Sequence, residues 1–569
     1  MMGHRDIDSN YVPPTDEQLD YLGRNSFPAW LALNAHRVFP DSFFASLYDH
    51  TNGRPSVAPS QLMTLLLLQT HFGVSQREAM QSAKFDLRYR IPLGLTGQDV
   101  LCARSTYVLF RTKLLVSGAS DNLFERALEE CKRAGFFKSK TFRVAIDTTE
   151  ILGWGAARDT YNLIADAITI LLRELARQQA VEVSELAREW GFAKYIESPS
   201  IKGSQSIDWN NPESRRAFLS GLVSDAAKIL QHYLDEAKGD SLNSLADEAA
   251  TLLAKILSQN LANDPKTGVL KIGRGVSKNR IPSAHDPEQR HGRKSNSKKF
   301  NGYKGELVKD VDSPAILGVR TKAGNEHDSS GSLESIELAE SHVKKVLGEE
   351  ARVAEVLADA AYGTGPNRVK FADSGRELIA KGPKLPGKKG FTKDDFKREV
   401  TDEGVVRTCP NGKKARGIPF SRHQKGKTVK GLKFKWPKAE CEVCPFRADC
   451  LNNGKRTKKK RKTGRTITEG PNEQVLREAR ENTKDSRFRA KLRERIPVEH
   501  AIEKIVRSGG RKIRYRGQTK AEFELKMRAL TLNLKAVATS EQIDREKRHF
   551  EPILRIIGCE NHLAQRQAA

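Results

Sequence analysis

Long apolar segments are missing from the sequence. The longest apolar run is Leu62 to Leu68 with its flanks, far short of the about 20 residues that a membrane helix requires. The first ten residues, MMGHRDIDSN, are polar and lack the apolar centre of a secretory signal. Both absences favour a cytoplasmic protein.

Cysteine is scarce as well. The 569 residues include seven cysteines, an odd number, of which four lie in one stretch of the chain. A disulfide framework needs pairs, so metal binding suits the clustered four better than disulfide bonding does. The other three are scattered: Cys102, Cys131 and Cys559.

Acidic residues are few relative to basic ones. Asp and Glu number 71 against 98 Lys and Arg, which gives a formal net charge of +27. Such an excess favours a polyanionic partner, nucleic acid first, although a solvated basic surface would also produce it. The charge indicates no particular chemistry. The length exceeds what one hydrophobic core usually organises, so we expect two to four domains or one domain with large insertions.

The pattern from about residue 15 to residue 135 is helical. Pro59 opens a helix that Gly73 closes, and Ser75 and Glu78 have the spacing of a capping box at the start of the next helix. These two helices form either a DNA-binding module or an ordinary helical hairpin with one solvent-exposed face. The DNA-binding hypothesis rests on the basic residues after the turn, Arg77, Lys84, Arg88 and Arg90.

Two short apolar runs each end close to an aspartate. FRVAI, residues 142–146, precedes Asp147, and ARVAEVL, residues 351–357, precedes Asp359. We expect both runs to be buried strands. Carboxyl ends of parallel strands form a crevice and Mg²⁺ prefers oxygen ligands, so both carboxylates are candidate metal ligands. An aspartate after a strand is also a common turn former or helix N-cap.

The segment between these runs predicts further elements. Residues 161–261 carry apolar residues at three and four spacing and predict a helical insertion. Strands are expected at residues 298–312 and 315–325, and a helix over SLESIELAESHVKKVLG. Three histidines, two of them followed by aspartate, are expected in loops or behind the site rather than in the catalytic set: His285, His291 and His327.

A third carboxylate should come from a helix that packs over the strand ends. Pro497 suits the start of a helix, which places Glu499 in the first turn and Glu503 on the same face one turn later. Both glutamates are also compatible with an ordinary charged helix surface. The residues alone leave the choice between the two open.

Four cysteines have the spacing of a zinc site. Cys441 and Cys444 form a CxxC pair, Cys450 follows after five intervening residues, and Cys409 lies upstream in TCPNG. The pattern resembles a treble-clef or ribbon zinc knuckle with a structural role, in a region rich in Gly and Lys that lacks an apolar core. Four reduced thiols in a loop-rich insert are the alternative. The basic stretch 455–465 is expected to be solvated or to grip DNA.

Ordered motifs run along nearly the whole chain, from about residue 20 to residue 540. They are GRPSVAPSQLMTLLLLQTHFGVSQREAMQSAKFDLRYRIPLGL, VAIDTTEILGWGAARDTYNLIADAI, HDPEQRHGRKSNSKKFNGYKGELVKD, AGNEHD, LADAAYG, IPVEH, RYRG and LTLNLKAV. In this order they resemble the bacterial insertion-sequence DDE transposases. Several independent motifs in the family's order are more specific than any one of them.

The resemblance implies a fold and three catalytic residues. The fold is an α/β RNase H-like core with a helical N-terminal domain, a helical insertion and a small Cys-rich insert. Asp147 and Asp359 match the family's two aspartates, and Glu499 matches its glutamate, which decides against Glu503. The implied ranges are 15–135 for the DNA-binding N-terminal domain, 140–160 with 285–380 and 470–540 for the core, 161–280 for the helical insertion and 390–465 for the Cys-rich insert.

The match to the family's C-terminal signature is incomplete. Arg495 resembles the arginine of that signature and would contact phosphate or orient the glutamate. The tyrosine of the signature falls on Leu492 and its lysine falls on Val506. Lys504 or Arg507 would have to substitute for that lysine.

The resemblance also implies a reaction and partners. The reaction is metal-dependent cleavage of DNA at transposon ends followed by strand transfer into target DNA, with two Mg²⁺ ions, or Mn²⁺, as cofactors. The partner is double-stranded DNA, as terminal inverted repeats and target, bound by a homodimer in the bacterial cytoplasm in association with the nucleoid. A catalytically silent transposase-derived DNA-binding regulator and an RNase H-like nuclease are the alternatives. The residues expected to bind DNA are Arg495, Lys504, Arg507, Arg514, Arg516, Lys455, Arg456, Lys458, Lys459, Lys460 and Arg461.

Overall fold

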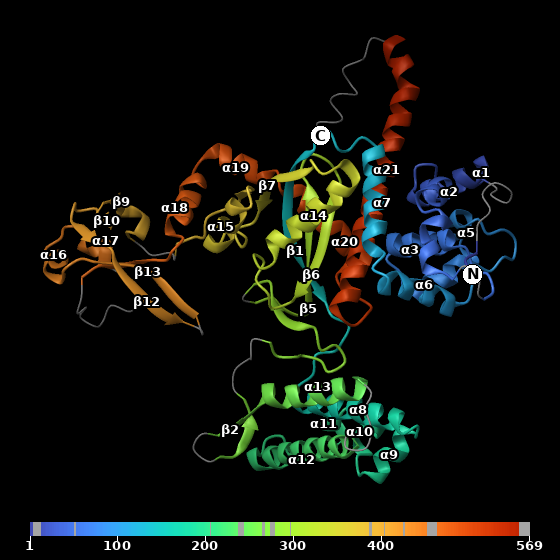
Figure 1. Ribbon diagram of the computed structural model, residues 1–569, viewed down its shortest axis with the longest axis horizontal. Helices are drawn as coiled ribbons and strands as arrows, with labels where there is room; N and C mark the ends of the chain where they lie inside the picture. Colours follow the sequence, from blue (N-terminus) through green and yellow to red (C-terminus); the bar gives the residue numbers. More distant parts are fainter. Residues whose placement is uncertain are drawn as a thin grey trace.

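A mixed sheet lies at the centre of the protein. The N-terminal helices lie on one side of it, a helical lobe lies below it, and a small β lobe lies on the side away from the N-terminal helices (Figure 1). Among the described residues, no helix combines the length and the apolar character that crossing a membrane demands. The computed structural model describes the chain except for residues 4–12, 50–52, 205, 237–243, 265–267, 274–278, 296, 386–389, 403, 425–426, 452–463 and 557–569.

The chain begins with helices, as the sequence predicts. Helix α3 begins at Pro59 and ends at Gly73, whose φ of 67° is left-handed and suits glycine. Ser75 and Glu78 make the predicted capping box at the start of α4. The helices of this region are α1 (Asp16–Leu22), α2 (Phe27–Val38), the 3-10 helix η1 (Asp41–Leu47), α3 (Pro59–Phe72), α4 (Gln76–Phe85), α5 (Leu87–Leu93), α6 (Arg104–Val116) and α7 (Ser120–Arg133).

The α3–α4 hairpin is embedded in the protein. Ten of the 14 residues of α3 are buried. Gly73 approaches Ser508 so closely that an added Cβ would lie 2.4 Å from the Ser508 carbonyl oxygen. Of the basic residues after the turn, Arg77, Lys84 and Arg88 are exposed. Arg90 is buried and donates to four backbone carbonyl oxygens, so its inclusion among the DNA-binding candidates is wrong.

The central sheet contains both parallel and antiparallel pairs. Its order is β4-β5-β1-β7-β8, and β6 also pairs with β5. The β1–β5, β5–β6 and β4–β5 pairs are antiparallel, whereas β1–β7 and β7–β8 are parallel. The strands are β1 (Thr141–Leu152), β4 (Arg290–Arg293), β5 (Lys299–Asp310), β6 (Ile316–Ala323), β7 (Arg352–Ala358) and β8 (Glu377–Ile379).

The first strand is longer than the sequence predicts. The apolar run suggests an end at Asp147, but β1 continues to Leu152 because its second half pairs with β5. Its parallel pairing with β7 stops at Ile146, opposite Ala358, so Asp147 still marks the end of the parallel part. The predicted strands at 298–312, 315–325 and 351–357 are confirmed as β5, β6 and β7 to within a few residues.

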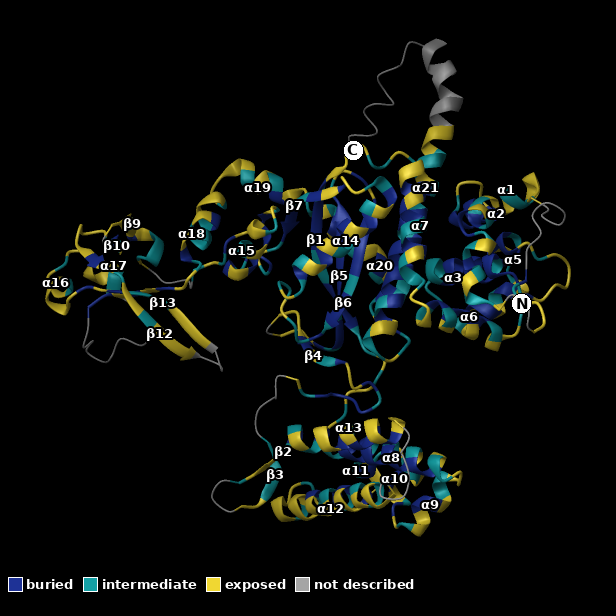
Figure 2. Ribbon diagram, viewed as in Figure 1, coloured by how far each residue is buried: buried dark blue, intermediate teal, exposed yellow. Residues whose placement is uncertain are grey.

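One continuous apolar core joins the N-terminal helices to the sheet and to the C-terminal helices. Phe27, Leu65, Ile146, Val498 and Leu530 all belong to it, although they come from α2, α3, β1, α20 and α21. Figure 2 shows the buried residues of the central sheet in dark blue. The helices around the sheet are α14 (Ser332–Leu347), α15 (Gly365–Asp373), α18 (Glu473–Asn482), α19 (Ser486–Arg493), α20 (Ile496–Ile505) and α21 (Gln518–Ile556).

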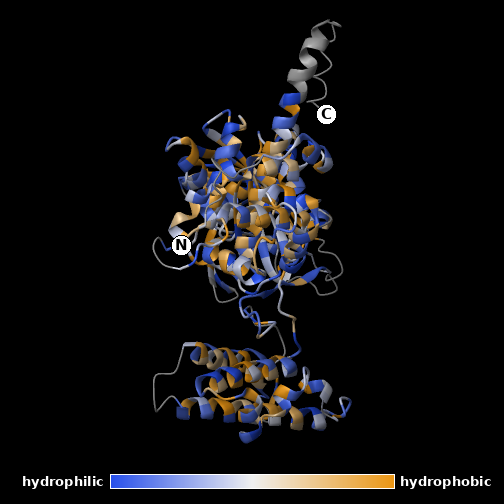
Figure 3. Cartoon of the chain, turned by 90° about the vertical axis from the view of Figure 1, so that its right-hand side faces the viewer, coloured by the Kyte–Doolittle hydropathy of each residue, from blue (hydrophilic) through white to orange (hydrophobic). Residues whose placement is uncertain are grey.

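The helical lobe forms where the sequence predicts an insertion. Helix α8 starts after Asp159, whose carboxylate accepts the N–H groups of Tyr161 and Asn162. The lobe has an apolar core separate from that of the sheet, and two connecting segments lead to it (Figure 3). Its elements are α8 (Thr160–Gln178), α9 (Val183–Glu189), α10 (Lys194–Glu197), α11 (Ile201–Ser204), α12 (Pro212–Glu236), α13 (Ser244–Asn260), β2 (Leu261–Asn263) and β3 (Leu270–Ile272).

The small β lobe follows β8 and consists of two three-stranded sheets. The sequence predicts a region without an apolar core, and that prediction is wrong. Phe396, Ala415, Phe434, Trp436 and Ile467 are buried against one another. The elements are η2 (Lys393–Asp395), β9 (Lys397–Thr401), β10 (Gly404–Thr408), β11 (Lys414–Arg416), β12 (Ile418–Gln424), β13 (Lys427–Lys435), α16 (Lys438–Glu442), α17 (Arg447–Leu451) and β14 (Thr466–Glu469).

Candidate active site

Neighbouring parallel strands bring two aspartates to one edge of the sheet. Ile146 of β1 is paired with Ala358 of β7, and Asp147 and Asp359 are the next residues along the chain. Parallel strands place such residues side by side at their carboxyl ends. Both carboxylates line a single pocket, together with Glu499.

Helix α20 brings Glu499 to this pocket. Pro497 lies in the first turn of the helix, where a backbone N–H has no partner within the helix and its loss is harmless. Val498, Ala501 and Ile505 are buried and dock the helix on the sheet. This docking leaves Glu499 beside the two aspartates.

Glu503, the alternative to Glu499, lies elsewhere. Its Oε1 is 2.6 Å from Nη2 of Arg507 in an exposed ion pair, and it does not line the pocket. The packing of α20 therefore places Glu499, and not Glu503, beside Asp147 and Asp359.

Arg495 bridges two of the three acids. Its Nη2 lies 2.5 Å from Oε1 of Glu499, and its Nη1 lies 3.6 Å from Oδ2 of Asp147. The second distance is that of an ion pair rather than a hydrogen bond. Nη1 is buried without a hydrogen-bond partner. Arg495 therefore supplies the pocket with positive charge and orients Glu499.

The titration of Asp147 reflects its burial and the charges around it. The pKa of Asp147 is raised to about 6, mainly by burial and to a smaller extent by the negative charges of Asp359 and Glu499. The Thr148 N–H and Arg495 oppose these effects by favouring the ionised form. Burial is thus the main reason why the ionised form of Asp147 is unfavourable, and an additional positive charge would stabilise that form.

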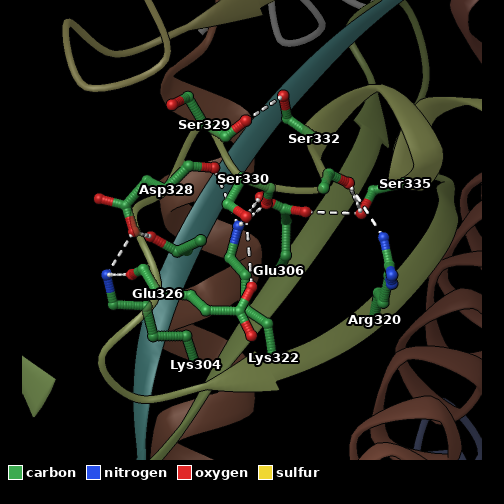
Figure 4. Close-up of polar contacts among 12 residues, drawn as sticks. Lys304, Glu306, Arg320, Lys322, Glu326, Asp328, Ser329, Ser330, Ser332 and Ser335 are labelled. Carbon is green, nitrogen blue, oxygen red and sulfur yellow. Dashed lines mark hydrogen bonds and ion pairs between the residues drawn. The ribbon is translucent and has the colours of Figure 1, made fainter. Parts of the chain in front are cut away.

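The pocket contains a fourth acid that sequence reasoning set aside. Asp328 lines it, and its Oδ1 accepts hydrogen bonds from Nζ of Lys304 at 2.7 Å and from Oγ1 of Thr148 at 3.0 Å (Figure 4). Thr148 follows Asp147 directly, so Asp328 is tied to the first aspartate. His327 does not line the pocket and contacts Ser329 instead. Only the pairing of distant segments reveals the role of Asp328, because its local sequence is that of a loop.

A buried network supports the loop that carries Asp328. Glu306 is 1% exposed and accepts hydrogen bonds from Lys322 at 2.7 Å, Ser335 at 2.5 Å and the Tyr362 hydroxyl at 2.8 Å. Lys322 also donates to the backbone carbonyl of Asp328 at 2.9 Å (Figure 4). Burial raises the pKa of Glu306, and Lys322 opposes that effect. Because Tyr362 lies three residues after Asp359, the network links both acid-bearing segments.

Basic side chains also line the pocket. Glu150 lines its wall and is ion-paired with Lys294 at 3.3 Å, with Lys298 at 3.1 Å and with Arg511. Arg293 also lines the pocket. The pocket thus combines carboxylates with basic side chains, an arrangement suited to metal ions and a phosphate group.

The carboxylates of the pocket fit a divalent cation. Asp147, Asp359 and Glu499 supply carboxylate oxygens, the ligands that Mg²⁺ and Mn²⁺ take. Burial raises the pKa of Asp147, and a bound cation would favour its ionised form. Among the described residues, no group of three or more His, Cys, Asp or Glu side chains is arranged so that it could already hold a metal ion.

Two segments of the chain match known families. Residues 408–538 match the family described as Transposase DDE domain, and residues 23–113 match Transposase domain (DUF772). The chain belongs to the insertion-sequence DDE transposases. No curated protein matches this transposase. The first match includes Glu499, whereas Asp147 and Asp359 lie outside both ranges. Membership implies a DNA-processing enzyme.

The basic residues predicted to bind DNA in the transposase lie in different places. Lys504 and Arg507 line a second pocket on another face of α20. The Arg514 guanidinium donates to the Gly73 carbonyl at 2.8 Å and so fastens α3. Arg516 lines a pocket beside the helical lobe. The remaining candidates lie outside the described residues: Lys455, Arg456, Lys458, Lys459, Lys460 and Arg461.

The four clustered cysteines of the transposase line one pocket of the small β lobe. Cys409 begins a tight turn in which its carbonyl accepts the Gly412 N–H at 2.8 Å. Burial raises the pKa of the Cys450 thiol; Arg465 opposes that effect, and the other three thiols add to it. The group of three or more ligands needed for a ready metal site is nevertheless absent from the described residues. Besides Cys409 and Cys450, the cysteines that line this pocket are Cys441 and Cys444.

Proposed function

We propose that this transposase cleaves DNA at transposon ends and joins the freed ends to target DNA, with Asp147, Asp359 and Glu499 as its metal ligands. One observation carries the proposal: three acids that lie far apart in the sequence line the same pocket, together with basic side chains. An RNase H-like core is part of the proposal. The central position of β1 between antiparallel β5 and parallel β7 supports it.

The residues of the pocket have different roles in the proposed reaction. Two Mg²⁺ ions, or Mn²⁺, would activate the attacking oxygen and stabilise the leaving oxygen when bound. Asp147 and Asp359 hold a fixed position because rigid strands carry them. Arg495 orients Glu499 and offers its buried Nη1 to a phosphate oxygen. Lys304, through Asp328 and Thr148, fixes the segment that carries Asp147.

The substrate is double-stranded DNA, as terminal repeats and as target. The net charge of +27 favours such a polyanion. Two ends must be cut together, so we propose a homodimer that assembles on DNA. Sedimentation of the full-length chain with and without a duplex that carries one end tests this part. A complex that contains a single chain per pair of ends would overturn it.

A cleavage assay distinguishes the proposal from its alternatives. Full-length transposase is incubated with Mg²⁺ or Mn²⁺ and labelled duplex that carries the DNA flanking its coding sequence. We expect nicking at the ends and joined products from the wild-type chain and from Glu503→Gln, and neither from Glu499→Gln. Nicking without joining would indicate a nuclease. Binding without nicking would indicate a silent regulator.

A structural zinc ion in the small β lobe is a separate part of the proposal. The convergence of Cys409, Cys441, Cys444 and Cys450 on one pocket supports it, because Zn²⁺ takes four thiolates. The lobe also has a small apolar core, so zinc would add to that core rather than replace it. We expect one zinc per chain by elemental analysis, lost in Cys444→Ser and kept in the control Cys102→Ser. Zinc-free wild-type protein purified without chelators would refute this part.

A further inference from the structure

A second large pocket lies next to α20. It has a volume of about 800 Å³ and is formed by α3, the turn between β5 and β6, α20 and α21. Its basic lining residues come from three separate segments of the chain. They are Lys309 of β5, Lys504 and Arg507 at the end of α20, and Arg528 and Lys535 of α21.

Helix α20 forms a wall of both pockets. Glu499 and Ile502 line the acidic pocket, whereas His500 and Lys504 line the basic one. Residues three or four apart share a helix face and successive residues do not, so one short helix serves two sites. Lys504 therefore faces away from the carboxylates and is not a substitute for the missing lysine of the C-terminal signature.

The three lysines of the basic pocket have no carboxylate partner. Among the described residues, no ion pair involves Lys309, Lys504 or Lys535. The Lys309 ammonium donates to two backbone carbonyl oxygens, at 2.6 and 2.9 Å, which satisfy its hydrogen bonds but not its charge. Asp312, which lines the same pocket, is ion-paired with Arg143 at 3.2 Å. Arg507 and Arg528 are ion-paired with Glu503 and Glu524, so the positive charge that the described residues leave without an ion pair here is that of the three lysines.

The titration of the lining groups agrees with this crowding. Burial lowers the pKa of Lys309 to about 8; Asp310 opposes that effect, and the charge of Lys504 adds to it. Burial and Lys504 also lower the pKa of Lys535. Burial and Lys535 lower the pKa of His71, on α3, to about 4. Each of these groups is destabilised in its charged form, and a bound anion would relieve all of them.

We propose that the basic pocket binds phosphate groups of the DNA backbone and holds the duplex on the far side of α20 from the carboxylates. The inference rests on the proposed function for its choice of DNA as the source of phosphate. Among the described lining residues none is Phe, Tyr or Trp, so the pocket offers no surface for base stacking. Contacts by lysine to backbone phosphate carry no sequence information, so the site fixes position and affinity rather than sequence choice.

The test measures affinity of the full-length chain for a duplex of arbitrary sequence over a range of salt concentrations. The variants are Lys504→Ala, Lys535→Met and their combination, with Lys484→Ala as the matched control, because Lys484 is exposed and paired with Glu481 on another helix. We expect affinity to fall several-fold for each pocket lysine. The slope of log affinity against log salt should become shallower by about 0.9 for each phosphate that the variant no longer neutralises, and the control should not change.

Stability of the free protein separates binding from a structural role. Lys535→Met removes a half-buried charge that repels its neighbours, so its thermal midpoint should stay level or rise while DNA affinity falls. A lower midpoint with unchanged affinity would overturn the proposal and make the lysine structural. Unchanged affinity and salt slope in the double variant would overturn it as well.

Inorganic phosphate serves as the probe for a free anion. If phosphate raises the thermal midpoint of the wild type but not of the double variant, while DNA affinity is equal in both, the pocket holds a small anion and the proposal for DNA fails. Failure of the proposed function looks different. In that case the wild type binds duplex with the expected salt slope but does not nick it with Mg²⁺ or Mn²⁺.

Discussion

The two pockets beside α20 differ in the sign of the charge that the chain leaves unneutralised. On one side, three carboxylates line the pocket, and Arg495 pairs with two of them, Asp147 and Glu499. On the other, three lysines without an ion pair face a cavity whose lining Asp312 is paired with Arg143 instead. Both arrangements are unfavourable in the free protein, and each is relieved by a ligand of opposite charge that binds only the folded state. A complex of DNA and metal ions supplies both ligands at once.

The largest expected effect concerns the acidic side. Asp147→Asn and Asp359→Asn keep the shape of the side chain and remove a negative charge, so the pocket loses its attraction for a cation. We expect strand cleavage to fall by more than ~100-fold, since even residues that only support metal ligands cost 10–100-fold when replaced. Cleavage of labelled end duplex measures this, and filter binding should show that DNA affinity is retained. Equal loss of binding and cleavage would break the comparison.

The bridging arginine should have the next largest effect. Arg495→Ala removes the group that orients Glu499 and leaves the carboxylates without their shared counter-charge. We expect a roughly 10–100-fold loss of cleavage with full DNA binding. Arg495→Lys should recover only part of the activity, because lysine carries the charge without the planar fork. A fully active Arg495→Ala would show that Glu499 needs no orientation.

The support behind Asp147 should matter less. Lys304→Met removes the ammonium that holds Asp328, which in turn holds Thr148. We expect about a tenfold loss of cleavage, of the size found for groups that orient metal ligands, with recovery at higher Mg²⁺ concentration. Lys140→Met, in an exposed pair with Glu350, is the control. A loss that no Mg²⁺ concentration restores would place Lys304 in contact with the substrate instead.

The smallest expected effect is a pH dependence of DNA affinity, which arises in the basic pocket. The pKa of Lys309 is about 8 in the folded chain, against 10.5 for an ordinary lysine, so the folded protein loses this charge between pH 7 and 9. Lys504 and Lys535 face it from α20 and α21, Asp310 adjoins it, and His71 is neutral in this range. DNA affinity should fall roughly threefold to tenfold over that interval.

The titration of Lys309 also affects how the stability of the free protein changes with pH. Above pH 8 the unfolded chain binds more protons at this lysine than the folded chain, so the stability of the free protein gains from Lys309 as pH rises towards 10.5. Lys309→Arg stays charged throughout and should flatten the affinity profile between pH 7 and 9. An unchanged profile in that variant would assign the pH dependence to another group.

Local signals in the sequence were sufficient for the helices and strands around the site. Pro59, Gly73 and the capping box of Ser75 and Glu78 set the bounds of α3 and the start of α4 through contacts within one turn. The apolar runs before Asp147 and Asp359 predicted strands that are present. The length of β1 was misjudged, because its second half depends on pairing with β5, which comes more than a hundred residues later.

The role of Asp328 and the core of the small β lobe depend on contacts between distant segments, which the local sequence does not indicate. The loop sequence around Asp328 gives no sign of the pocket that it joins, since Lys304 and Thr148 reach it only through the sheet. The small β lobe was expected to lack an apolar core, because its buried residues are spaced widely among Gly and Lys and meet only when two sheets form.

The sequence by itself determined where secondary structure begins and ends and, through its ordered motifs, the family. Those properties depend on neighbouring residues and on patterns that need no folded chain. The tertiary structure shows Glu499, and not Glu503, beside the two aspartates, as the family match implies, and it alone decided that Lys504 belongs to a different pocket from Glu499. The reason is that α20 docks through Val498, Ala501 and Ile505, and this docking fixes which side of the helix each charge faces.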